Sequence, residues 1–162
     1  MTTEERFLGL IDENRQRIAR VCRYYVSMSG IMSADDLFQE IVFNLWKSYP
    51  RYVKSPDCQT ATWVYRVALN VAISEARKHR KTPKVSIDEK AADFVADDEQ
   101  PERIELLYSL ISQLNREEQA LVFLYLEEKS HREMAEIMGI SVSNVGTRIQ
   151  RIKLKLKQLN NE

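Results

Sequence analysis

The chain has 162 residues, and its 24 lysines and arginines balance 24 aspartates and glutamates, so the protein is neither strongly basic nor strongly acidic. This length allows one domain or two small ones. The two cysteines, Cys22 and Cys58, exclude a disulfide framework or a zinc-binding spacing, and two free thiols favour a cytoplasmic location. Residues 1–6 are polar and charged, so no signal peptide is expected there, and no apolar run is long enough for membrane insertion.

The residue usage predicts an all-α fold. Glycine and proline are scarce, with four of each, whereas residues that favour helix are common. Acidic residues crowd positions 88–105, and basic residues crowd positions 77–84 and 148–157. Two basic stripes around an acidic spacer suggest two anion-binding modules. Solvated helix faces are the alternative explanation of the same charges.

The first half is predicted to form three helices. Apolar residues recur at helical spacing until Ser29 and Gly30 interrupt the pattern. Ser33 is the expected N-cap of a second helix, with acidic residues in its first turn. This helix should end near Tyr49, because Pro50 disfavours helix in the residue before it. A third helix is expected from about 60 to 80.

A linker is predicted between the two halves. Helical periodicity fails from 82 to 100, where acidic residues and one proline replace large apolar side chains. Two small helical domains joined by a flexible acidic linker are therefore expected, spanning 1–81 and 101–162. Pro101 suits the first position of a new helix.

Two helices should open the second half. The first has an apolar stripe made of Leu106, Leu107, Leu110, Ile111 and Leu114. Asn115 then caps the second helix, with Glu118 at the spacing of a capping box. The buried side of that helix is expected to comprise Leu121, Val122, Leu124 and Tyr125.

A helix-turn-helix is predicted near the C-terminus. Ser130 and Glu133 have capping-box spacing, Gly139 suits the residue after a helix, and Ser141 suits the cap of the next. The last helix has an apolar stripe made of Val145, Ile149, Ile152, Leu156 and Leu159. Its opposite side is polar and basic, which suits base edges and phosphates in a major groove. A plain helical hairpin with a solvated basic face is the alternative.

The third helix combines an aromatic residue with cations. Trp63, Arg66 and Asn70 fall on one side of a helical wheel, followed by Arg77 and Lys81. An exposed ring beside Arg and Asn could stack bases of single-stranded DNA while cations hold the backbone. An aromatic residue on a helix is more often part of a core, so this pattern alone is weak.

Three stretches together resemble one family, the extracytoplasmic-function (ECF) sigma factors of the sigma-70 family. Asp36 to Trp46 is similar to the polymerase-binding helix of that family, and Thr62 to Asn70 is similar to its −10 recognition helix. Glu133 to Arg151 is similar to its −35 helix-turn-helix. The resemblance covers nearly the whole chain in the expected order. It implies a subunit that directs RNA polymerase to promoters.

The resemblance also implies roles for individual residues. Those expected to bind core polymerase are Asp36, Gln39, Glu40, Phe43 and Asn44. Those expected to bind and open the −10 element are Tyr52, Trp63, Arg66, Asn70, Arg77, Lys78 and Lys81. Those expected to read the −35 element are Ser143, Asn144, Thr147, Arg148, Gln150 and Arg151. Gly146 stands where many relatives have a basic residue, so one familiar contact is missing.

The implied partners are core RNA polymerase, promoter DNA and an anti-sigma factor, with no metal or other cofactor. A free-standing helix-turn-helix regulator is the main alternative, but it leaves the first half unexplained. An enzyme is not expected, because His79 and His131 have no nucleophile–base pairing and no glycine loop cradles phosphate. A pure interaction protein fits the acidic linker but not the two basic stripes.

Overall fold

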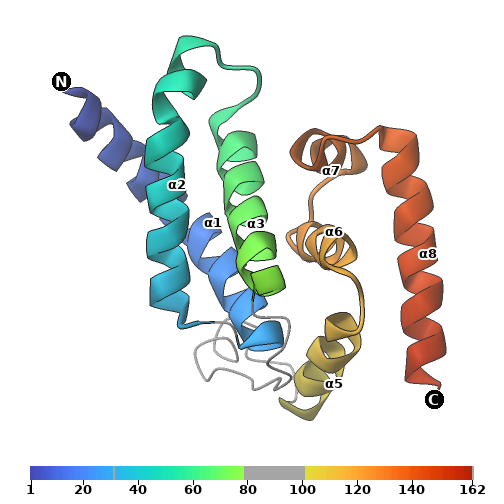
Figure 1. The fold of residues 1–162 in the computed structure, drawn as a ribbon. Helices are drawn as coiled ribbons and strands as arrows, with labels where there is room; N and C mark the ends of the chain where they lie inside the picture. The colour runs from blue at the N-terminus through green and yellow to red at the C-terminus, as the bar shows by residue number, and fades with distance from the viewer. Residues whose placement is uncertain (31, 79–100, 162) are drawn as a thin grey trace.

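The computed structural model describes residues 1–30, 32–78 and 101–161, and the linker predicted at 82–100 and Lys81 lie outside these ranges. The described residues form seven helices and no strand, which confirms the all-α prediction. The helices are α1 (Thr3–Ser29), α2 (Ala34–Lys54), α3 (Thr60–Lys78), α5 (Pro101–Ser112), α6 (Arg116–Leu126), α7 (His131–Met138) and α8 (Val142–Asn160). Figure 1 shows α1–α3 gathered on one side and α5–α8 on the other.

Local sequence signals determine where several helices begin and end. The hydroxyl of Ser33 accepts a hydrogen bond from the backbone N–H of Asp36, as an N-cap does. Asn115 and Glu118 form the reciprocal capping box at the start of α6. Gly30 ends α1 in the left-handed conformation, with a φ of 57°. These ends agree with the prediction because each depends on neighbours in the sequence.

The prediction that the second helix ends near Tyr49 is wrong. Helix α2 continues through Pro50 for one further turn, although proline removes a backbone donor and crowds the preceding turn. Tertiary contacts hold this turn in place. The buried ring of Tyr49 lies 5.2 Å from that of Phe7 on α1, and the hydroxyl of Tyr52 donates to the carbonyl of Cys58 at 2.7 Å. Because both tyrosines are anchored outside α2, packing outweighs the local preference of proline.

The buried faces of α5 and α6 also differ from the predicted ones. Leu106 and Leu107 are 51% and 38% exposed, and the buried face of α5 comprises Ile104, Tyr108 and Ile111, while Leu114 is buried just after the helix. On α6, Tyr125 is 49% exposed and Phe123 is buried in its place. Both helices are apolar on more than one side, so periodicity alone could not say which side meets the rest of the molecule.

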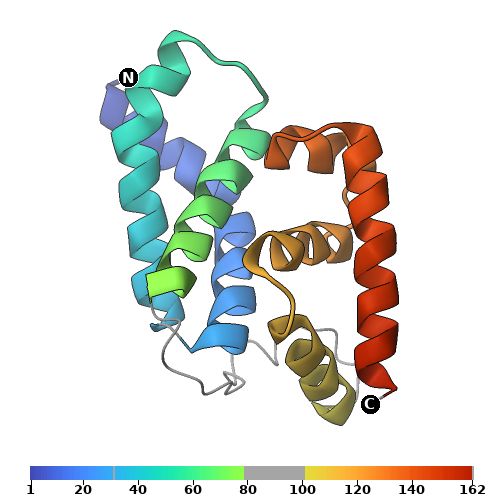
Figure 2. The same ribbon diagram turned by 45° about the vertical axis from the view of Figure 1, so that its right-hand side comes forward.

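The two groups of helices pack directly against each other. Helix α3 lies against α6 and α7, and α1 lies against α5 (Figures 1 and 2). Their buried side chains join into one continuous apolar cluster. At its centre the hydroxyl of Tyr24 on α1 donates to the carbonyl of Gln119 on α6 at 2.6 Å. The helix-turn-helix therefore lies beside the third helix in this structure.

Replacing glycine with alanine should lower the stability of the protein at one position and raise it at another. Gly139 has a φ of 70°, so Gly139→Ala is expected to cost about 1 kcal/mol of unfolding free energy, although no neighbour lies within 4 Å of the added methyl. Gly9 lies exposed inside α1 with the same open space, so Gly9→Ala should add roughly 0.5–1 kcal/mol. Chemical denaturation measures both. An equal effect of the two substitutions would contradict the assigned role of backbone conformation.

Candidate nucleic-acid interface

One exposed face of α2 has the residues predicted to bind polymerase. Asp36, Gln39, Glu40 and Phe43 are exposed, while Asn44 is half-buried. These positions are three and four residues apart, so they form a continuous stripe on the helix. The opposite face buries Leu37, Ile41 and Leu45 completely. The stripe is therefore free to contact another molecule without disturbing the core.

Two contacts organise this face of α2. The side-chain amide of Asn44 donates to the carbonyl of Glu40 at 2.8 Å. The Nζ of Lys47 lies 4.7 Å from the ring centroid of Phe43, a cation–π contact. Phe43 is nevertheless 54% exposed. An exposed aromatic ring between acidic and amide groups is typical of a protein-binding surface.

An aromatic cluster lies where α2 meets α3, and Trp63 is buried inside it. That indole is only 7% exposed, so of the two readings of the sequence the core position holds and the exposed stacking ring does not. Its ring stacks on Tyr52, with centroids 4.4 Å apart and planes 7° apart. Tyr49 covers it from another side at 6.2 Å. Trp63 thus supports Tyr52, which is half-buried and is the more accessible ring.

The polar residues of α3 face the second group of helices. Arg66 donates from Nε and Nη2 to the carbonyl of Glu136 on α7, at 2.9 and 2.6 Å. Asn70 lines a cleft of about 210 Å³ between α3 and the end of α7, together with Arg66 and Gly139. Asn70 itself is exposed. The structure therefore brings Arg66 and Asn70 together beside the helix-turn-helix.

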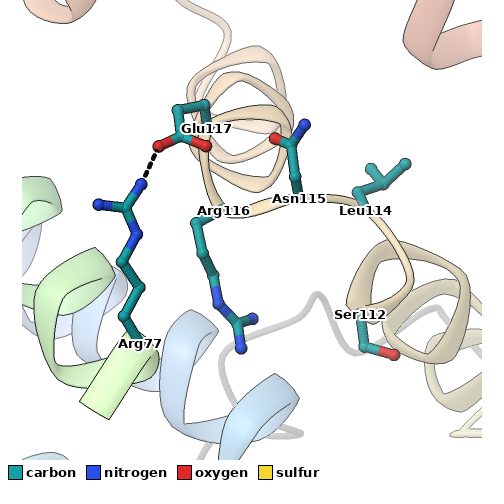
Figure 3. A pocket seen from close by; sticks show the side chains of 6 residues that line it. All are labelled: Arg77, Ser112, Leu114, Asn115, Arg116 and Glu117. Carbon is teal, nitrogen blue, oxygen red and sulfur yellow. Dashed lines mark hydrogen bonds and ion pairs between the residues drawn. The ribbon is translucent and has the colours of Figure 1, made fainter. Parts of the chain in front are cut away.

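The last cations of α3 are also engaged. Arg77 forms an ion pair with Glu117 at the beginning of α6, and Figure 3 shows this pair bridging the two helices. The Nζ of Lys78 lies 3.3 Å from Oε1 of Glu75 on the same helix. Both basic side chains remain largely exposed. Arg77 and Lys78 extend the cationic part of α3 beyond Asn70.

The helix-turn-helix forms as its caps predict. The hydroxyl of Ser130 accepts from the backbone N–H of Glu133, and that of Ser141 accepts from the N–H of Asn144. Gly139 adopts the left-handed conformation between the two helices, with a φ of 70°. The apolar side of α8 buries Val145, Ile149 and Ile152, while Leu156 and Leu159 are half-buried.

The polar side of α8 presents the residues predicted to read duplex DNA. Ser143, Thr147, Gln150 and Arg151 are exposed. Arg148 is half-buried, and its Nε donates to Oδ1 of Asn144 at 3.2 Å. This bond holds one guanidinium beside the start of the helix, whereas Arg151 extends into solvent. At Gly146, the position without a basic side chain, an added Cβ would lie 3.9 Å from Nδ1 of His131, which is an ordinary contact.

Three residues that sequence reasoning missed join the two groups of helices. Glu127 lies at the end of α6 and accepts hydrogen bonds from Arg20 on α1 and Tyr65 on α3. These residues belong to no motif, and Glu127 lies 107 positions after Arg20 and 62 positions after Tyr65 in the sequence. The burial of Glu127 is the only feature that would have pointed to this contact, and the sequence does not show which acids are buried.

A helix-turn-helix with a polar, cationic face, packed beside a second cationic helix, defines an all-α DNA-binding protein. Residues 10–82 match the family model for Sigma-70 region 2, and residues 104–156 match that for Sigma-70, region 4. The chain therefore belongs to the sigma-70 family, in its ECF subfamily, whose members act in transcription initiation.

Two curated relatives and one solved structure are similar to the chain. The ECF RNA polymerase sigma factor SigM of Bacillus subtilis (strain 168) is 31% identical over 147 residues, which cover 87% of this chain and 88% of SigM. SigW of the same organism is 25% identical over 172 residues, covering 96% and 89%. The structure of CnrH in complex with the cytosolic domain of CnrY has a TM-score of 0.65 at 21% identity, and the match covers 98% of this chain and 90% of CnrH. None of the helices in the described ranges is long and apolar enough to cross a membrane.

Proposed function

We propose that the chain binds core RNA polymerase through α2, opens the −10 element with α3 and reads the −35 element with α8. The observation that supports this most strongly is the placement of three separate polar faces, each on a helix whose other face is buried. Acidic and amide groups lie on α2, cations and Asn70 lie on α3, and a polar cationic face lies on α8. We assign the two halves to residues 1–81 and 101–162.

Promoter opening is assigned to the surface formed by Tyr52, Arg66 and Asn70. A flipped base can stack on an exposed ring and bond to an amide, while cations hold the strand. Tyr52 offers a partly accessible ring fixed by its stacking on Trp63. Asn70 offers an exposed amide on the same helix as Arg66. Arg77, Lys78 and Lys81 would follow the backbone of the same strand.

Replacing Asn70 tests this assignment. Asn70→Ala is expected to slow open-complex formation roughly tenfold, because a lost hydrogen bond that leaves a buried partner unpaired costs about 1–2 kcal/mol. Closed-complex binding should be unchanged. Permanganate footprinting with core polymerase measures the open bubble. Asn160→Ala, at an exposed position at the end of α8, is the matched control. Normal opening by Asn70→Ala would place the base pocket elsewhere.

Readout of the −35 element is assigned to the exposed side of α8. Arg151 is exposed and points away from Val145 and Ile149, so it suits direct contact with a base edge. Arg148 is held by Asn144 near the N-terminus of the same helix, where phosphates also bind. Ser143, Thr147 and Gln150 complete the proposed reading surface.

The proposed setting is the cytoplasm, where core polymerase is found. Cys22 and Cys58 are free thiols in the structure. Burial raises the pKa of Cys22 to about 12, so this thiol stays protonated at neutral pH. An anti-sigma factor is a further proposed partner, because CnrH, which shares this fold, was solved in complex with the cytosolic domain of CnrY.

A further inference from the structure

Gly146 lies inside α8 although neither the backbone nor the packing requires a glycine there. Apart from proline, glycine is the least favourable residue inside a helix. Gly146 does not have the positive φ found at Gly30 and Gly139. A Cβ added to it would lie 3.9 and 4.0 Å from Nδ1 and Cε1 of His131, which are ordinary contacts. The neighbour that a side chain at position 146 would approach is therefore the imidazole ring of His131.

The ring of His131 and a long side chain at position 146 would reach the same part of the surface. His131 is the first residue of α7, and α7 packs against α8. A lysine or arginine at position 146 would begin beside the two ring atoms and extend past them. The glycine leaves this space to the imidazole, which offers ring nitrogens where the side chain of a basic residue would otherwise lie.

The imidazole also lies beside the surface proposed to read the −35 element. Gly146 is three residues after Ser143 and four before Gln150, so these three positions share one side of α8. Ser143, Gln150 and His131 are exposed. Within the part of the chain that the structure describes, no hydrogen bond or ion pair engages the His131 ring. Its N–H is therefore available to a ligand on that side of the helix-turn-helix.

The position of the ring suits a phosphate better than a base edge. In a helix-turn-helix, the first helix crosses the DNA backbone while the second enters the major groove. His131 begins the first of these helices, where the helix dipole also favours an anion. The acid of that turn, Glu133, is engaged, because its carboxylate accepts from the hydroxyl of Ser130 at 3.2 Å and lies 3.8 Å from Nζ of Lys129. The charge that would repel a phosphate is thus partly neutralised.

We propose that His131 donates from its ring N–H to one phosphate of the −35 element, in the space that Gly146 leaves open. The proposal rests on the proposed function, because it needs α8 in the major groove of that element. Such a contact fixes the register of the helix-turn-helix on the duplex and carries no sequence information of its own. A histidine on α7 thereby replaces the basic side chain that α8 lacks at position 146.

Uncharged backbone probes test for this phosphate contact. The full chain with core polymerase is titrated by fluorescence anisotropy against a labelled promoter duplex that the wild-type holoenzyme selects from a library with a randomised −35 element. In further duplexes, one −35 phosphate at a time is replaced by a methylphosphonate. His131→Ala should bind the unmodified duplex roughly tenfold more weakly than the wild type, because a hydrogen bond to a charged group is lost. At one position the methylphosphonate should weaken the wild type much more than His131→Ala, and at the other positions both proteins should lose equally.

A cation placed at position 146 should substitute for the ring. Gly146→Lys added to His131→Ala is expected to restore affinity to within about twofold of the wild type, because the ammonium regains a charge-assisted bond to the same phosphate. Gly9→Lys, which adds the same charge at an exposed glycine inside α1, is the matched control and should restore nothing. Circular dichroism checks that all variants keep their helix content.

Several results would overturn this contact. They are wild-type affinity of His131→Ala for the unmodified duplex, equal methylphosphonate losses in both proteins at every position, and no restoration by Gly146→Lys. Equal restoration by Gly9→Lys would also do so, because net charge would then be the cause. Failure of the proposed function looks different, because Arg151→Ala would then leave duplex affinity unchanged as well. Arg151→Ala should still weaken binding if only the role of His131 is wrong.

Discussion

Reversing the charges of Asp36 and Glu40 together is expected to weaken binding to core polymerase at least about a hundredfold. Both side chains are exposed on the polar stripe of α2, and neither bonds to the rest of the fold through its carboxylate within the described residues. In a complementary interface, each like-charge contact costs several kcal/mol. Two such contacts suffice to remove binding at the concentrations used in a pull-down. Asp36→Lys/Glu40→Lys should consequently give no run-off transcript.

The control must distinguish loss of the polymerase interface from damage to α2 itself. Lysine at position 36 faces the positive end of the helix dipole, which costs about 0.3–1 kcal/mol. Glu4→Lys/Glu5→Lys makes the same charge change in the first turn of α1 and carries a similar dipole cost. Circular dichroism should show both variants folded, and only the α2 variant should lose polymerase. Equal retention by the two variants would remove this face of α2 from the interface.

Features that depend on near neighbours could be predicted from the sequence. Ser33, Asn115 and Ser141 cap helices because a short polar side chain reaches an N–H two or three residues on. Gly139 separates the two helices of the helix-turn-helix because it tolerates a positive φ. The three polar faces follow from helical periodicity, which places residues three and four apart on one side.

Features that depend on distant packing could not be predicted. Pro50 continues α2 only because Tyr49 and Tyr52 are anchored by α1 and by the loop before α3. Trp63 has the position of an exposed ring on a helical wheel, but the adjacent tyrosines cover it. The ion pair between Arg20 on α1 and Glu127 after α6 is the clearest case. Glu127 pairs with Arg20 across the molecule, and no local pattern marks either residue.

The free protein should bind promoter duplex weakly, and core polymerase should increase its affinity at least about a hundredfold. Several cations on the helices proposed to contact DNA already have partners. Arg66 bonds to α7, Arg77 pairs with Glu117, and Lys155 on α8 pairs with Glu118. Few side chains remain to release counterions, so affinity at physiological salt should lie near the non-specific range of roughly 10⁻⁴–10⁻⁶ M. Specific complexes reach about 10⁻⁸ M or tighter.

Polymerase should raise affinity by holding the two groups of helices apart at both promoter elements, which makes the second contact intramolecular. Anisotropy with a labelled promoter duplex measures this with and without core enzyme. Nanomolar, sequence-specific duplex binding by the isolated wild type would instead indicate a helix-turn-helix regulator that works without polymerase.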